Sequence, residues 1–77
     1  MDELKYEIKK NLIILSESTK GWRKEVNVIS WNEGKPKLDI RDWDGEHKKM
    51  GKGVTLNKDE VAALGKYLKD TNFDTIL

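Results

Sequence analysis

The residues best suited to bind a ligand lie in one short segment, residues 37–43, with the sequence KLDIRDW. Side chains alternate between the two faces of a β-strand, so Leu38 and Ile40 share one face, which we expect to be the core side. The other face carries an ammonium, a carboxylate, a guanidinium and an indole, which belong to Lys37, Asp39, Arg41 and Trp43. Cations that neutralise phosphates beside a ring that stacks on bases suit single-stranded nucleic acid. The same pattern is also typical of an edge strand with solvated charges and a half-buried tryptophan.

Basic and aromatic residues are concentrated in the middle of the chain. The net charge is only +1, which argues against a histone-like protein that binds by charge alone. Residues 20–58, however, contain most of the lysines and arginines and all three tryptophans. Interleaved basic and aromatic residues are typical of a nucleic-acid surface. Acidic residues occupy the same window, so folding must separate the two signs of charge.

A second strand is predicted over residues 22–31. Alternation places Val26 and Val28 on one face and Asn27 and Trp31 on the other. If the valines are buried, Trp31 is exposed beside Asn27, on the same outer face as the tryptophan of the following strand. A single tryptophan is as often a core residue. Two tryptophans on one polar face favour a binding role.

The loop between residues 44 and 53 excludes several common sites. Its glycines resemble a phosphate loop, but their spacing is one residue too long and Gly53 replaces the required Ser or Thr. Its acidic residues lack the closing glutamate of a calcium loop. His47 is the only histidine and the chain has no cysteine, so neither a zinc site nor a catalytic triad is indicated, and we expect an exposed loop histidine. The loop lysines are either phosphate ligands or solvated.

The remaining elements are a first strand, a short last strand and one helix. The first strand, residues 4–18, is interrupted at Lys10 and Asn11, which indicates a turn or bulge. Its apolar run, residues 12–15, predicts burial on both faces, under the helix or against another subunit. A polar turn follows, in which Gly21 is expected to adopt an unusual backbone angle.

The last strand is predicted over residues 54–56 and the helix over residues 58–70. Asn57 can cap the helix while Glu60 reaches back to the cap, which forms a capping box. The apolar stripe of the helix belongs to the core or to a subunit interface, and it consists of Val61, Leu64 and Leu68.

The length of 77 residues predicts one domain over residues 1–77, with a sheet over about 5–56, a helix over about 58–70 and an apolar tail over 71–77. So small a domain buries little apolar surface, which makes a second subunit a reasonable expectation. We expect no disulfides, membrane span or signal peptide, and a cytoplasmic, potentially nucleoid-associated, location.

Two ordered blocks, LDIRDW and GKGVTLNKDEVAAL, together with SESTKGWRKEVNVISWN, resemble the single-stranded-DNA-binding domain of the positive cofactor four family of transcriptional coactivators, especially its short bacterial branch. The resemblance covers about residues 5–70. It implies an α+β fold, a curved four-stranded antiparallel sheet followed by one C-terminal helix (ββββα), and a homodimer formed through the helix and sheet edges. The family binds single-stranded or unpaired DNA without strong sequence preference. Eukaryotic members carry a Ser- and Lys-rich arm before the domain, and we expect no such arm here.

The resemblance implies a set of nucleic-acid-binding residues. The aromatic and basic positions of the DNA surface correspond to Trp31, Arg41 and Trp43, and the basic loop positions to Lys35, Lys48 and Lys52. The local pattern adds Trp22, Lys24, Asn27 and Lys37. The expected dimer interface contains Val61, Leu64 and Leu68.

These observations predict a sequence-tolerant single-stranded DNA-binding dimer that serves transcription regulation, replication or repair, with RNA and unpaired duplex regions as related ligands. The alternative is a small protein-interaction adaptor without nucleic acid. No enzyme activity, catalytic residue, metal, cofactor or small-molecule substrate is expected.

Overall fold

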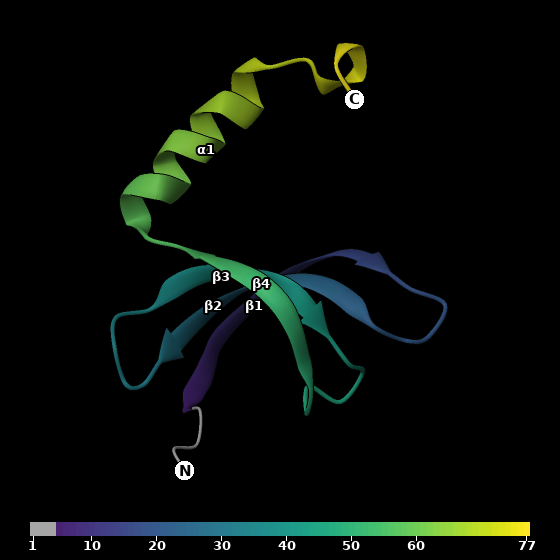
Figure 1. Ribbon diagram of the computed structural model, residues 1–77. Coiled ribbons are helices and arrows are strands. Elements are labelled where there is room, and N and C mark those ends of the chain that lie inside the picture. The colour runs from purple at the N-terminus through teal and green to yellow at the C-terminus, as the bar shows by residue number, and fades with distance from the viewer. Residues whose placement is uncertain (1–4) are drawn as a thin grey trace.

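The computed structural model describes residues 5–77, and the first residue of the predicted first strand, Leu4, lies outside them. Four strands form one antiparallel sheet in the order β1-β2-β3-β4, and a helix follows (Figure 1). The elements are β1 (Tyr6–Glu17), β2 (Arg23–Trp31), β3 (Lys37–Trp43), β4 (Met50–Leu56), α1 (Lys58–Asp70) and a 3₁₀ turn η1 (Phe73–Thr75). The predicted antiparallel sheet followed by one helix is confirmed.

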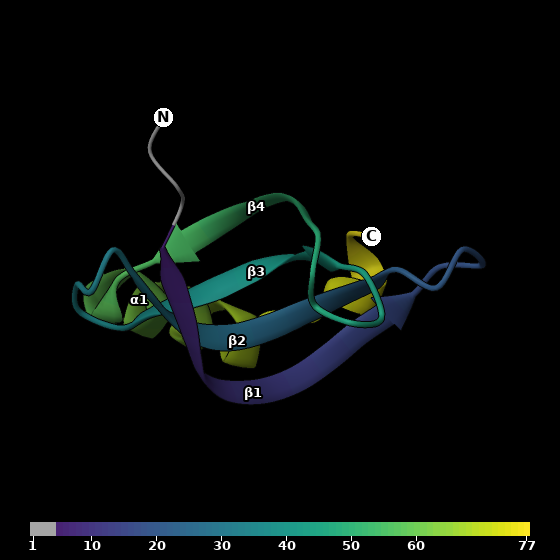
Figure 2. The same ribbon diagram turned by 90° about the horizontal axis from the view of Figure 1, so that it is seen from below.

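The sheet is strongly curved. Glu25 and Trp31 are six positions apart in β2, which corresponds to roughly 20 Å in a straight strand. Arg41 pairs with Glu25 in the register, yet its guanidinium carbon lies only 4.8 Å from the centre of a Trp31 ring. The strands therefore bend around the space between these side chains, as the arched sheet in Figure 1 and the view from below in Figure 2 show.

Bulges in β1 accompany this curvature. The pairing of β1 with β2 shifts register between Ile8 and Lys10, between Asn11 and Ile13, and between Ile14 and Ser16. An extra residue on one strand bends that strand and increases its local twist. The predicted interruption at Lys10 and Asn11 is therefore a bulged region within one continuous strand.

The concave face is the better-buried face of the sheet, contrary to the prediction of a core on the valine side. The side chains with no exposed surface lie on this face, and they are Glu25, Asn27, Ile29, Asp39 and Trp43. On the convex face Val26 is buried, Leu38 and Ile40 are half-buried, and Val54 is 49% exposed. The prediction failed because curvature closes the concave face on itself, whereas the chain's own helix does not cover the convex face.

The helix lies on the convex side of the sheet (Figure 1) and contacts β3 and β4. The predicted capping box is present: Asn57 Oδ1 accepts from the Glu60 N–H, and a Glu60 carboxylate oxygen accepts from the Asn57 N–H, both at 2.8 Å. No residue of α1 is buried within the described chain. Leu64 is 41% exposed and Leu68 is 51% exposed, so the apolar stripe remains open.

The apolar run of β1 is also open in the single chain, so its predicted burial under the helix is wrong, whereas burial against another subunit stays a prediction. Leu12, Ile13, Ile14 and Leu15 are 40–54% exposed, because β1 forms an edge of the sheet and has a neighbour on one side only. Gly21 has φ +85°, as predicted for the turn between β1 and β2. Within residues 5–77 no helix is long and apolar enough to span a membrane.

Candidate nucleic-acid interface

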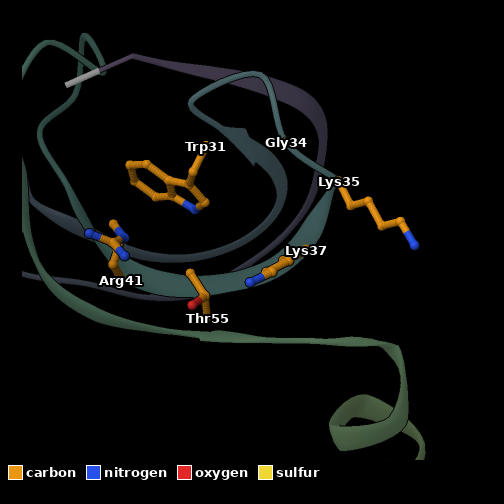
Figure 3. Close-up of a pocket in the computed structure, with 6 residues that line it drawn as sticks. All are labelled: Trp31, Gly34, Lys35, Lys37, Arg41 and Thr55. Atoms are coloured by element: carbon orange, nitrogen blue, oxygen red, sulfur yellow. The ribbon is translucent and has the colours of Figure 1, made fainter. Parts of the chain in front are cut away.

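A groove opens beside the concave face where β2, β3 and β4 approach each other. Its volume is about 490 Å³, and we define the groove by its lining residues Trp31, Gly34, Lys35, Lys37, Arg41 and Thr55. Figure 3 shows the indole of Trp31 facing the side chains of Arg41 and Thr55, whereas Lys35 extends outward from the rim. An indole, a guanidinium and the Lys37 side chain therefore surround one open space, and Lys35 stands at its rim.

The turn between β2 and β3 positions the rim of the groove. Asn32 and Glu33 both adopt left-handed backbone angles, with φ 51° and 62°. The Gly34 N–H donates to the Trp31 carbonyl at 2.9 Å, and the Ser30 hydroxyl donates to the Gly34 carbonyl at 2.7 Å. These bonds tighten the hairpin, so Lys35 is brought back beside Trp31.

Trp31 is held between two neighbours. The Arg41 guanidinium lies 4.8 Å from the centre of one of its rings, within the range of a cation–π interaction. The ring of Tyr6 lies 5.6 Å away on β1, at an interplanar angle of 43°. Trp31 is half-buried, so these contacts fix its orientation and still leave part of the indole open to the groove.

Arg41 is paired with a carboxylate beneath the groove. Its Nε and Nη2 donate to the two oxygens of Asp39, at 2.7 and 2.8 Å, in a bidentate ion pair. Its Nη1 donates to the Gly51 carbonyl at 3.4 Å. Asp39 has no exposed surface, so one of the acidic residues that shares the basic window of the sequence is withdrawn from the groove.

A second buried carboxylate, that of Glu25, organises the other end of the concave face. Glu25 Oε1 lies 2.8 Å from His47 Nε2 and accepts from the amides of Asn11 and Asn27, at 3.1 and 3.2 Å. Arg23 Nε lies 3.3 Å from its other oxygen. Burial alone would raise the pKa of Glu25, but the hydrogen bonds from His47 and Asn27 and the charges of His47 and Arg23 hold this pKa below its usual value.

The contact between His47 and Glu25 anchors the loop between β3 and β4, which passes across the concave side of β2 (Figure 2). His47 is half-buried with φ 58°, so the prediction of an exposed loop histidine was wrong. Asp44 Oδ1 accepts from the N–H groups of Lys48 and Lys49, at 2.8 and 3.0 Å. The bond from Lys49 is the main reason why the pKa of Asp44 is lowered. This loop is therefore ordered by its own carboxylate and by the sheet.

The structure brings together four of the ten predicted nucleic-acid-binding residues in the groove: Trp31, Lys35, Lys37 and Arg41. Lys48 and Lys52 are exposed but do not line it. Trp22 and Lys24 line a separate hollow of about 380 Å³ near the β1–β2 turn, together with Lys20. These four positions therefore lie on surfaces of the chain outside the groove.

Two predicted site residues require correction. Trp43 shares its face with Trp31, as predicted, because Tyr6 contacts both indoles at 5.6 Å. Trp43 is nevertheless fully buried beneath Tyr6 and His47, so its ring is closed to a base in this conformation. Asn27 is also fully buried and bonds to Glu25 and Asn11. Curvature, which alternation alone does not reveal, encloses both.

Sequence reasoning missed the residues that support the groove, Tyr6, Asp39 and Gly53. The sequence pattern placed Asp39 on the correct face but among solvated charges. Asp39 and Arg41 are two positions apart, a spacing that puts them on the same strand face and could have indicated their ion pair. Gly53 was assigned to the loop, whereas it lies in β4 opposite Arg41. Because glycines are poor strand formers, the predicted strand began at residue 54 instead of Met50.

Comparison with known proteins identifies the family of this chain. Residues 18–67 match the family described as Transcriptional Coactivator p15 (PC4), a match that contains all of β2, β3 and β4 and most of α1. A protein of Treponema pallidum (strain Nichols), described as an uncharacterized protein, is 44% identical over 73 residues, which cover 95% of this chain and 86% of the relative. The chain therefore belongs to the Transcriptional Coactivator p15 (PC4) family.

Proposed function

We propose that this protein binds single-stranded DNA with little sequence preference, through the groove beside Trp31. The observation that carries the proposal is the convergence of an indole, a guanidinium and two lysines on one open space of about 490 Å³. Stacking surfaces combined with cations are the general means of binding single strands without reading their sequence. Membership of a family described as a transcriptional coactivator supports a role in transcription, and replication or repair could use the same activity.

In the proposed mechanism the lysines and the indole have separate tasks. Lys35 and Lys37 contact phosphates and release counterions, and each contact should contribute about 0.7 to the slope of log affinity against log salt. Trp31 stacks on a base, and stacking contributes roughly 1–3 kcal/mol per base. Trp43 belongs to the support of the groove, because it is buried. RNA and unpaired regions of duplex present the same bases and phosphates, so they are candidate ligands as well.

We further propose that two copies pair through their convex faces and helices. The apolar stripe of α1 and the apolar side of β4 are exposed in one chain, with Leu64 at 41%, Leu68 at 51% and Val54 at 49%. Covering such surfaces is favourable, and a chain of this size gains stability from a second subunit. Because the groove lies beside the opposite, concave face, a dimer of this kind would present two grooves to the nucleic acid.

Titration with an unstructured thymidine oligonucleotide tests the binding function. We expect quenching of tryptophan fluorescence that saturates and weakens with added salt. Trp31→Ala should lower the affinity by about 5- to 150-fold, the equivalent of one lost stacking contact. Trp22→Phe is the matched control, because Trp22 lines the separate hollow and its replacement should leave the affinity nearly unchanged.

A protein that remains folded and shows no binding at low salt would refute the proposal. In that case a protein-interaction adaptor becomes the better candidate. The exposed apolar run of β1 and the open stripe of α1 are the surfaces that such an adaptor would use.

A further inference from the structure

The contacts of Arg41 point to a task other than phosphate binding. All three guanidinium nitrogens already have acceptors within the protein: Nε and Nη2 bond to Asp39, and Nη1 bonds to the Gly51 carbonyl. The positive charge is compensated by a carboxylate with no exposed surface. One N–H of Nη2 remains for a phosphate, but a phosphate that took over the two bonds made to Asp39 would leave the buried carboxylate without its partner, which is strongly unfavourable.

The pair also fixes where the guanidinium lies. With two parallel hydrogen bonds to Asp39, its plane is set by the carboxylate, and its carbon lies 4.8 Å from the centre of a Trp31 ring. A planar guanidinium stacks on an aromatic face and supports it. The buried carboxylate therefore determines, through Arg41, how the indole is presented to the groove.

Gly53 provides the space in which Arg41 lies. It is the β4 residue directly opposite Arg41 in the register. A Cβ atom at position 53 would overlap the Arg41 Cβ, and it would lie 2.5 Å from the Ile40 carbonyl oxygen and 2.9 Å from the Arg41 Nε. At Gly51, on the same strand, an added Cβ would meet only ordinary contacts, the nearest being the Asp42 Cβ at 3.4 Å. Position 53 thus excludes a side chain because the Arg41 side chain and the Ile40 carbonyl occupy the space that a Cβ would need.

We propose that Asp39 and Gly53 are positioning residues that hold the Arg41 guanidinium against the Trp31 ring. The Asp39 carboxylate compensates the charge of this guanidinium. Arg41 then contributes to the binding of single-stranded nucleic acid by fixing the stacking indole, and the charge of the phosphates is met by the lysines. This inference rests on the proposed function, and it assigns to the Asp39–Arg41 pair a role in base stacking.

The salt dependence of binding separates the two roles of Arg41. A lost phosphate contact reduces the slope of log affinity against log salt by about 0.7 for a single strand. We expect Lys37→Gln to show this reduction, whereas Arg41→Gln should keep the wild-type slope and lose about 5- to 150-fold in affinity, as for lost stacking. Asp39→Asn should release the charge of Arg41 and make the slope steeper by about 0.7.

A measurement without DNA tests the positioning itself. In a Trp22→Phe background only Trp31 and the fully buried Trp43 emit, so acrylamide quenching reports mainly on Trp31. Gly53→Ala should displace Arg41 and raise the quenching constant of Trp31, and it should lower the affinity for the thymidine oligonucleotide. Gly51→Ala, the matched control on the same strand, should change neither quantity.

The outcomes distinguish this inference from the proposed function. A wild-type protein that does not bind the oligonucleotide would overturn both. Binding by the wild type together with a slope reduced by about 0.7 in Arg41→Gln would retain the function and refute the inference, because Arg41 would then be a phosphate ligand. Equal quenching in Gly53→Ala and Gly51→Ala would refute the role of Gly53.

Discussion

Trp43 and Trp31 lie on the same face of the sheet, but only Trp31 has surface open to the groove. The same substitution should therefore lower mainly the stability at Trp43 and mainly the affinity for the oligonucleotide at Trp31. A fully buried tryptophan removes roughly 150–250 Å² from water, and its replacement by alanine costs about 3–5 kcal/mol. Phenylalanine refills most of the space. Because the Trp43 Nε1 is buried without an acceptor among residues 5–77, Trp43→Phe also removes an unpaired donor. We therefore expect Trp43→Phe to cost about 1–2 kcal/mol of unfolding free energy.

Thermal unfolding and oligonucleotide titration of Trp43→Phe and Trp31→Phe, at one protein concentration, test this difference. Each kcal/mol should lower the melting temperature by about 4–8 °C for a domain of this size. Trp43→Phe should lose stability and keep its affinity within about threefold, since the groove retains its stacking ring. Trp31→Phe should unfold nearly as the wild type does. Unchanged stability with a large loss of affinity in Trp43→Phe would show that Trp43 itself stacks on bases, and our interpretation of the buried indole would be wrong.

Three further predictions concern the supporting structure. The pKa of Glu25 is lower in the folded protein than in the unfolded chain, so its stabilising contribution is present at neutral pH and is lost as the pH falls through the acidic range. Denaturant titrations at pH 7 and pH 3 should therefore show a smaller acid loss for Glu25→Gln than for the wild type, and equal losses would contradict this. Asn57→Ala should cost about 0.5–2 kcal/mol in the same assay by removing the cap of α1, whereas Asn72→Ala, beyond the helix, should cost less. If the proposed dimer is correct, Leu64→Glu should shift sedimentation toward the monomer, while Lys66→Glu, off the apolar stripe, should not.

Features set by local sequence were predictable. Alternation placed Trp31, Arg41 and Trp43 on one face, and the capping signal located the start of α1. Both depend on neighbours within a few residues, which the chain order specifies directly.

Burial was less predictable, because it depends on how far the sheet bends. In a flat sheet the face that carries Asp39 and Arg41 would be solvated and the valine side would be the core. The curvature brings together residues from β1, β2 and the loop after β3, and so encloses Asp39, Trp43 and Glu25. The register shifts in β1 accompany this bending, and the importance of Gly53 appears only when the residue across the strand pair is known.

The open apolar run of β1 has a consequence for how the protein behaves at high concentration. Leu12 to Leu15 form an uncharged, apolar window on an edge strand, which is the pattern that promotes strand-to-strand aggregation. Lys9 and Lys10 precede it, and the register shifts twist the edge, both of which oppose such pairing. Because strand pairing between copies is an intermolecular process, raising the protein concentration should therefore shorten the time for which the protein stays in solution.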